Sequence, residues 1–177
     1  ATVLGAGPIG LLCLQAARAA GAGPVFVSEP VPARREAALK LGADAVIDPT
    51  SEDAVEKIVE LTGGIGTQVV FECAAAKNTL DQALNIVTRE GQVVLVSLEW
   101  EPTPVLPVVW IAKEVKLQAS FGSMPEEWRI ALDLIKSGKV DMGPLLTDAG
   151  YVPLTGIQRT FEALVKPTTQ LQMVVRL

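Results

Sequence analysis

Histidine is absent from the 177 residues, and this absence excludes several kinds of catalytic site. Ser-His-Asp triads, Cys-His pairs and zinc sites that use imidazole all need a residue that the chain does not contain. Acid or base chemistry would therefore depend on carboxylates or lysine. We predict neither a catalytic residue nor a metal ligand in this sequence.

Cysteine is almost as scarce, because only Cys13 and Cys73 are present. Two cysteines are too few for a disulfide scaffold or for a structural zinc site, which usually needs four ligands. A reducing, cytoplasmic location is therefore expected. The chain does not start with a signal-peptide pattern, and its apolar runs are interrupted well before the ~20 residues of a membrane span. We expect no membrane association.

The charge balance and the hydrophobic content indicate an ordinary folded domain. The chain has 15 basic and 20 acidic residues, so its formal net charge is -5. An acidic chain is not expected to bind nucleic acid. Hydrophobic residues make up 49% and charged residues 20%, far from the composition of disordered chains. The length fits one domain, or one domain and part of a second.

Short apolar runs alternate with helical segments over about the first 120 residues. We predict strands over residues 2–4, 24–29, 45–47, 69–72, 92–97 and 115–120, and helices over 8–20, 33–41, 51–61 and 78–88. This alternation predicts an α/β fold: a Rossmann-type, doubly wound parallel sheet of six strands. In the first helix, Ile9, Cys13, Ala16, Ala17 and Ala20 recur at helical spacing and are predicted to face the sheet.

The pattern changes towards the end of the chain. Residues 101–107 contain three prolines and predict an irregular linker. Helices over 126–137 and 154–165 and a strand over 170–175 then predict a C-terminal helix and strand extension. We assign residues 1–123 to the Rossmann domain and 124–177 to this extension.

A glycine-rich turn between the first strand and the first helix carries the functional signal. Gly5 suits the tight turn, Gly7 leaves room for a pyrophosphate beside the backbone, and Gly10 lets the helix pack close to the strand. Pro8 suits the first helical position, and unpaired N–H groups there attract phosphate. Glu29, 19 positions after Gly10 at the end of the next strand, would accept hydrogen bonds from the adenosine ribose. The alternatives are that the glycines form a purely structural turn and that Glu29 is a solvated residue at a strand end.

These residues resemble the zinc-type medium-chain alcohol and polyol dehydrogenases, within the butanediol, sorbitol and threonine dehydrogenase branch. The resemblance extends over nearly the whole chain. Its matching segments are Val3-Leu4-Gly5-Ala6-Gly7-Pro8-Ile9-Gly10, Val27-Ser28-Glu29-Pro30, Arg34-Arg35, Leu41-Gly42-Ala43-Asp44, Phe71-Glu72-Cys73-Ala74, Ile135-Lys136-Ser137-Gly138-Lys139 and Pro144-Leu145-Leu146-Thr147. Ala75 departs from the family, in which glycine is usual at this position.

The resemblance implies an NAD site with contacts from several parts of the chain. It assigns the pyrophosphate turn to Gly5, Gly7, Pro8, Ile9 and Gly10, and the ribose contacts to Glu29 and Arg34. It also places Cys73 and Ala74 in the cofactor cleft, and Val96, Ser97, Leu98 and Phe121 beside the nicotinamide. Ordinary core positions for Cys73 and Phe121, and a helix-surface position for Arg34, are the alternatives.

The resemblance also implies what lies outside this sequence. Family members carry about 170 residues before the glycine turn, with the catalytic zinc ligands. Residues 1–4 here already read as the end of a buried strand, so we expect a fragment of a longer protein. It would hold NAD(H) for hydride transfer with a secondary alcohol or polyol, while the fragment itself would be inactive, with zinc confined to the missing domain.

Two other functions fit parts of the sequence. A stand-alone NAD-binding or regulatory module without catalysis would need the same glycine turn and the same acid. A methyltransferase also holds an adenosine ribose with an acid after its second strand, but the GAGPIG turn and the C-terminal extension argue against it.

The last strand of the predicted sheet suggests a homodimer. The six-strand order places residues 115–120, from Val115 to Ser120, at an edge with unpaired backbone groups. Lys116 contributes charge, but Val115, Leu117 and Ala119 alternate with few blocking features. Antiparallel pairing with the same strand of a second copy would satisfy this edge, and the resemblance implies the same arrangement. An edge protected within its own chain is the alternative.

Overall fold

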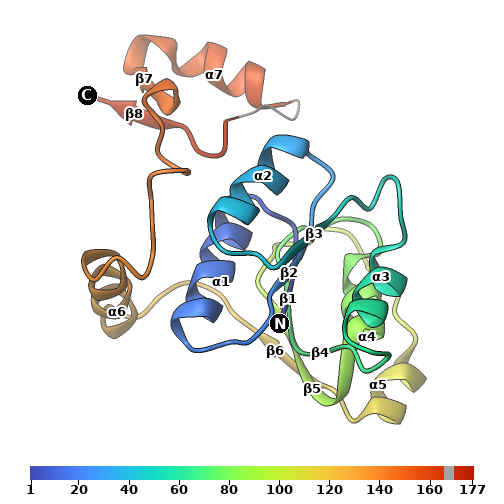
Figure 1. The fold of residues 1–177 in the computed structure, drawn as a ribbon. Helices are drawn as coiled ribbons and strands as arrows, with labels where there is room; N and C mark the ends of the chain where they lie inside the picture. Colours follow the sequence, from blue (N-terminus) through green and yellow to red (C-terminus); the bar gives the residue numbers. More distant parts are fainter. Residues whose placement is uncertain (166–169) are drawn as a thin grey trace.

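The computed structural model of the protein describes residues 1–165 and 170–177, and it contains a six-stranded parallel sheet (Figure 1). The strands lie in the order β3-β2-β1-β4-β5-β6, which confirms the predicted Rossmann-type topology. Their bounds are β1 Thr2–Leu4, β2 Phe26–Ser28, β3 Ala45–Ile47, β4 Thr67–Glu72, β5 Val87–Leu95 and β6 Lys116–Ala119.

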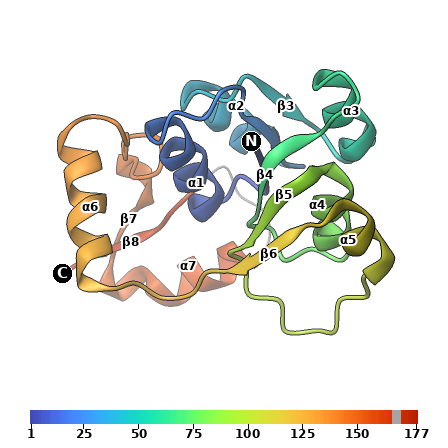
Figure 2. The same ribbon diagram turned by 90° about the horizontal axis from the view of Figure 1, so that it is seen from below.

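Helices cover both faces of this sheet. The helices α1 (Pro8–Ala19) and α2 (Pro32–Lys40) lie on one face, and α3 (Ala54–Leu61), α4 (Thr79–Ile86) and α5 (Pro107–Lys113) lie on the other (Figure 2). Val3 and Val27 pair in register and belong to the apolar cluster on the α1 side, whereas Leu4 and Phe26 belong to the opposite cluster. Burial on both faces explains why these strands are apolar without alternation.

The face of α1 that meets the sheet differs in part from the predicted one, because Ala17 alone of the predicted residues is buried. Leu11, Leu14 and Ala17 are buried there, whereas Ile9 and Ala16 are exposed. Both sets recur at helical spacing, so periodicity alone cannot select between them. The larger leucine side chains occupy the core because they remove more apolar surface from water.

Two other boundaries on the α5 side of the sheet also differ from the predictions. The helix expected over residues 78–88 ends at Ile86, and β5 begins at Val87 instead of residue 92. The chain between these points includes Glu90 with a φ of 59°.

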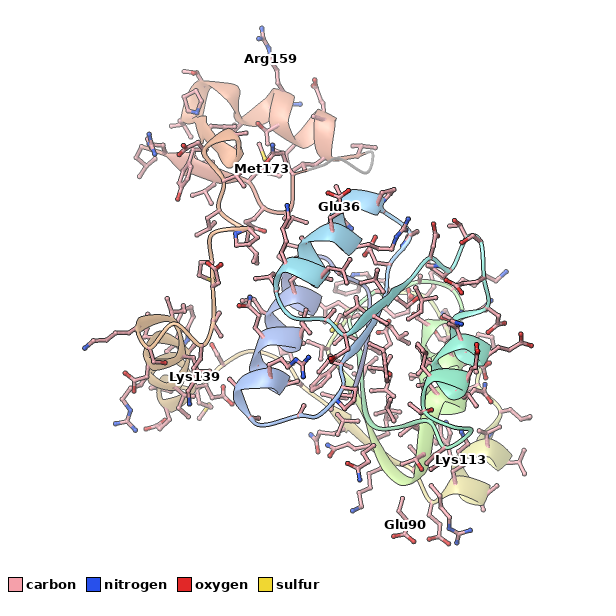
Figure 3. The ribbon with its side chains drawn as sticks, in the orientation of Figure 1. Glu36, Glu90, Lys113, Lys139, Arg159 and Met173 are labelled. Atoms are coloured by element: carbon pink, nitrogen blue, oxygen red, sulfur yellow. The ribbon has the colours of Figure 1, made fainter. Side chains whose placement is uncertain are left out.

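Residues 107–113 form α5, which was not predicted as a helix. Its Lys113 ammonium, labelled in Figure 3, donates to the carbonyl oxygens of Leu84, Asn85 and Val87 and so holds α5 against the end of α4.

The C-terminal extension contacts the sheet domain through a short segment after α6 (Pro125–Lys136). The buried side-chain amide of Gln15 donates to the Asp141 carbonyl at 3.1 Å and accepts from the Asp141 N–H at 2.6 Å. Leu145 is buried in the cluster beneath α1 and α2. Beyond this point, β7 (Tyr151–Pro153), α7 (Ile157–Leu164) and β8 (Val174–Arg176) form a small lobe in which β7 and β8 pair in parallel (Figure 1).

Candidate functional site

The three glycines of the turn after β1 occupy three different environments. Gly5 has a φ of +92°, a conformation that favours glycine, and a Cβ there would lie 3.0 Å from the Ala74 Cβ. A Cβ at Gly10 would lie 1.8 Å from the Gly5 carbonyl oxygen, so the start of α1 touches the turn itself. At Gly7, by contrast, a Cβ would meet no heavy atom of the described residues within 4 Å. Gly5 and Gly10 thus allow close packing, and Gly7 keeps a space open.

The start of α1 faces this open space. Gly7 is the N-cap residue and Pro8 follows in the first turn, with no side-chain cap from the described part of the chain. The first N–H groups of a helix lack partners within the helix and carry partial positive charge. This end of α1 is therefore suited to an anionic group such as a phosphate.

Glu29 links the glycine turn to the end of β2. Its side chain is only 3% exposed. Oε2 accepts a hydrogen bond from the Ala6 N–H at 2.7 Å, and Oε1 accepts one from the Val31 N–H at 2.9 Å. A carboxylate has about four lone-pair positions, so both bonds leave capacity for a further donor.

The two arginines of α2 take different positions. Arg34 lies beside Glu29, with Nη1 4.0 Å from the carboxylate Oε1, and its buried Nε has no hydrogen-bond partner among the described residues. Arg35 points elsewhere, because it pairs with Asp48 at 2.9 Å and donates to the Glu29 and Pro30 carbonyl oxygens. Only Arg34 of this pair faces the space beside Glu29.

A cavity of about 520 Å³ connects these groups at the carboxyl ends of β1, β2 and β4. In the strand order, β1 and β4 are the neighbours between which the direction of winding reverses, and ligands of doubly wound sheets bind at this point. The volume lies within the usual range of ligand pockets. Its lining residues are Leu4, Gly5, Gly7, Ser28, Glu29, Pro30, Val31, Arg34, Pro49, Cys73, Ala74, Ala76, Lys77, Asn78, Thr79 and Gln82.

The structure brings together one part of the predicted site. Gly5, Gly7, Glu29, Arg34, Cys73 and Ala74 all line the cavity. Pro8, Ile9 and Gly10 form the adjoining first turn of α1 without lining it. The remaining predicted residues, Val96, Ser97, Leu98 and Phe121, lie outside the cavity.

Val96 and Ser97 belong to a separate cluster around Glu72, at the end of β4. Both backbone N–H groups donate to the Glu72 carbonyl oxygen, and the Ser97 hydroxyl donates to the buried Glu72 carboxylate. The other carboxylate oxygen accepts from the N–H groups of Ala74 and Ala75 at 3.0 Å each. Leu98 and Phe121, by contrast, are largely exposed to solvent, at 54% and 86%.

Glu72 and the residues at the start of α4 were not predicted as site residues. Glu72 fixes the loop in which Ala75 adopts a left-handed φ of 49°, a backbone conformation that favours glycine. Lys77, Asn78, Thr79 and Gln82 line the cavity from the α4 side. Their position just after a parallel strand was the available signal, because the carboxyl ends of such strands share one edge of the sheet.

Neither a metal centre nor a membrane span can be located in the described residues. Residues 1–165 and 170–177 contain no group of three or more His, Cys, Asp or Glu side chains that could hold a metal ion. In the same residues, no helix is long and apolar enough to cross a membrane.

Comparisons with known proteins give one consistent family. Residues 8–137 match the model of the family described as "Zinc-binding dehydrogenase". The L-threonine 3-dehydrogenase of Thermococcus kodakarensis is 40% identical over 164 residues, which cover 92% of this chain and 47% of that protein. The (R,R)-butanediol dehydrogenase of Bacillus subtilis is 34% identical over 177 residues, which cover 99% and 50%.

A solved structure of 2R,3R-butanediol dehydrogenase from Bacillus subtilis matches the fold with a TM-score of 0.89 at 33% identity. The match covers 99% of this chain and 50% of the solved one. The chain therefore spans about half the length of the relatives that it matches.

Proposed function

Because the chain belongs to the zinc-binding dehydrogenase family, we propose that it is the NAD-binding part of a dehydrogenase acting on a secondary alcohol or polyol. The observation that carries this proposal is the open space at Gly7, which adjoins both the start of α1 and the Glu29 carboxylate. The glycine turn would hold the pyrophosphate, and Glu29 would accept hydrogen bonds from the adenosine ribose.

Different residues of the cavity would contact different parts of the dinucleotide. The N–H groups at the start of α1 would bind the charged phosphates, and Arg34, which lines the cavity, would lie near the adenosine ribose. Glu72 supports the loop after β4 and the Ser97 hydroxyl, which would form the wall towards the nicotinamide. Bound NAD would supply the hydride acceptor, and the chain would orient it.

The alcohol site and the zinc site of the whole enzyme are proposed to lie in segments outside these 177 residues. The sequence has no histidine, and the described residues form no metal-binding group. Residues 124–177 would contact that catalytic part, because α6 presents the exposed side chains of Trp128, Ile130 and Leu132. Under this proposal, residues 1–123 are the NAD-binding domain.

Calorimetric titration of the chain tests this function. NADH is expected to bind at one site per chain. S-adenosylmethionine is expected not to bind, because it has no pyrophosphate to occupy the space at Gly7 and the start of α1. Adding a secondary alcohol to the chain with NAD should produce no NADH absorbance, and elemental analysis should find no stoichiometric zinc.

Four outcomes would contradict parts of the proposal. Absence of NADH binding would refute the cofactor assignment, and preferential binding of S-adenosylmethionine would favour the methyltransferase. Alcohol-dependent NADH formation would overturn the inactivity of the chain. The stand-alone module would be favoured if the catalytic segments of the relatives proved absent from the complete gene.

We also propose that two copies associate through β6, the edge strand of the sheet. All four residues of β6 are exposed. The Ser120 N–H donates inward to the Leu95 carbonyl oxygen, and N–H groups alternate in direction along a strand. The N–H groups of Leu117 and Ala119 therefore point outward, where the same strand of a second copy would meet them.

Leu117→Pro is expected to convert the dimer into a monomer at tens of micromolar protein. Proline removes an outward N–H and leaves the inward bonds to β5 in place. Light scattering would measure the mass, and Leu117→Ala, which keeps the N–H, should remain dimeric. A monomeric unmodified chain, or a folded Leu117→Pro variant that stays dimeric, would rule out this interface.

A further inference from the structure

The two cysteines of the chain lie next to each other, although 60 positions separate them in the sequence. Cys13 belongs to α1 and Cys73 directly follows β4, and their Sγ atoms are 3.8 Å apart. Both are free thiols and both are partly exposed. The binding function proposed above gives Cys73 a place in the cavity wall but gives Cys13 no role.

This thiol pair bridges the two elements that enclose the candidate pyrophosphate site. Cys13 lies on the helix whose first turn would bind the phosphates. Ala74, the residue after Cys73, has its Cβ 3.0 Å from the position of a Gly5 Cβ and so already touches the glycine turn. A covalent bond between the two sulfurs would therefore connect the middle of α1, one turn beyond its phosphate-facing end, to the loop after β4.

We propose that Cys13 and Cys73 form a reversible internal disulfide under oxidation, and that this disulfide weakens binding of the dinucleotide. The second half rests on the proposed NAD-binding function, whereas the first half does not. The oxidant is a small-molecule disulfide such as oxidised glutathione.

The reaction is a balanced thiol–disulfide exchange. The Cys13 thiolate attacks one sulfur of the oxidant, which forms a mixed disulfide and expels one small thiolate. The Cys73 sulfur then attacks the Cys13 Sγ, the internal disulfide forms, and the second small thiolate leaves. The two protons of the protein thiols end on the two leaving groups, so two protein thiols are oxidised while one oxidant disulfide is reduced.

The order of attack follows from the hydrogen bond between the thiols. The Cys73 S–H donates to the Cys13 sulfur, which lowers the pKa of Cys13, and the same bond together with burial raises the pKa of Cys73. Cys13 is thus the better thiolate and the attacking group. Once it is in the mixed disulfide, its negative charge no longer opposes ionisation of Cys73.

Closing the disulfide requires movement next to the cavity. A disulfide bond is about 2.05 Å long, so the two sulfurs, now 3.8 Å apart, must approach each other by nearly 2 Å. Because Ala74 is in contact with the Gly5 turn, a shift of the Cys73 loop displaces the turn as well. A bound dinucleotide would in turn cover Cys73 and oppose this movement.

The test treats the chain with oxidised glutathione and follows mass, free thiols and NADH affinity. Both thiols are expected to disappear with the loss of two hydrogen atoms and with no glutathione retained. NADH affinity should fall at least about tenfold, and dithiothreitol should restore it. Since coupling between two sites is reciprocal, saturating NADH should raise, by a similar factor, the concentration of oxidised glutathione needed for half-oxidation at a fixed concentration of reduced glutathione.

Cys13→Ser is the matched control, because it keeps Cys73 in the cavity wall and cannot form the disulfide. Its remaining thiol should stay free, and its NADH affinity should not change on treatment. A variant that keeps its free Cys73 thiol and yet loses NADH affinity on treatment as the unmodified chain does would overturn the role of the disulfide.

The two halves of the proposal fail in different ways. Two unreacted thiols or two glutathione adducts in the unmodified chain would overturn the disulfide. A disulfide that leaves NADH affinity unchanged would overturn its effect on binding. A reduced chain that does not bind NADH would refute the proposed function, while the mass measurement would still decide whether the disulfide forms.

Discussion

Gly7→Val is expected to weaken NADH binding at least about 100-fold while leaving the fold intact. A Cβ at this position meets no heavy atom of the described residues within 4 Å, so the valine side chain has room in the free protein. The pyrophosphate would lie in this space, so the valine side chain would exclude it. A tenfold loss in affinity corresponds to about 1.4 kcal/mol, and the expected 100-fold loss therefore to about 2.8 kcal/mol. Calorimetric titration would measure binding, and thermal unfolding would report stability, which should change by no more than about 1 kcal/mol.

Gly10→Ala is the contrasting variant three positions along the same turn. Its Cβ would lie 1.8 Å from the Gly5 carbonyl oxygen, and this backbone atom cannot rotate away. We expect a loss of about 3 kcal/mol of stability or more, because overpacking of a close backbone contact forces the helix away from the strand. If Gly7→Val bound NADH normally, or if Gly10→Ala were as stable as the unmodified chain, the roles given to these glycines would be wrong.

Features set by local sequence could be predicted well. The alternation of apolar runs with helices predicted the parallel sheet, because strands such as Phe26–Ser28 are buried at every position. The glycine spacing predicted the turn, since Gly5 alone among these positions needs a positive φ and Gly10 alone has no room for a side chain. Each of these properties depends on residues a few positions apart.

Features set by tertiary contacts were missed. Helix α5 was not predicted because residues 107–113 are short and apolar, and its Lys113 finds its partners only at the distant end of α4. The apolar face of α1 was misassigned in part, since its rotation depends on how Leu11 and Leu14 pack in the apolar cluster against the sheet.

The candidate site divides in the same way. The positions of Glu29 and Arg34 beside the cavity could be predicted, because Glu29 directly follows β2 and Arg34 lies in the first turn of the next helix, α2. The bond from the Ala6 N–H to Glu29 and the contact between Cys13 and Cys73 join residues far apart in the chain, and their side-chain directions are not encoded in spacing. Val96, Ser97, Leu98 and Phe121 stay predictions, because the cavity does not reach them.

Glu29→Gln is expected to relax a preference for NADH over NADPH by about 10-fold to 100-fold, equal to about 1.4 to 2.8 kcal/mol. In the unmodified chain the buried carboxylate would face the 2'-phosphate of NADPH, which carries up to about two negative charges, and it cannot turn to solvent because the Ala6 and Val31 N–H groups hold it. Glutamine removes the charge and keeps an oxygen that can accept from Ala6. Parallel titrations with both cofactors would measure the change.

Arg34 decides whether the effect is electrostatic. Its guanidinium lies 4.0 Å from the Glu29 carboxylate, whereas Arg35 is already paired with Asp48. Once the carboxylate charge is removed, Arg34 is free to attract the 2'-phosphate, so adding Arg34→Gln to Glu29→Gln should lower NADPH affinity again by about tenfold and leave NADH affinity nearly unchanged. Equal binding of NADH and NADPH by the unmodified chain would show that Glu29 does not select the cofactor. A preference that survives Glu29→Gln would place the discriminating group elsewhere in the cavity.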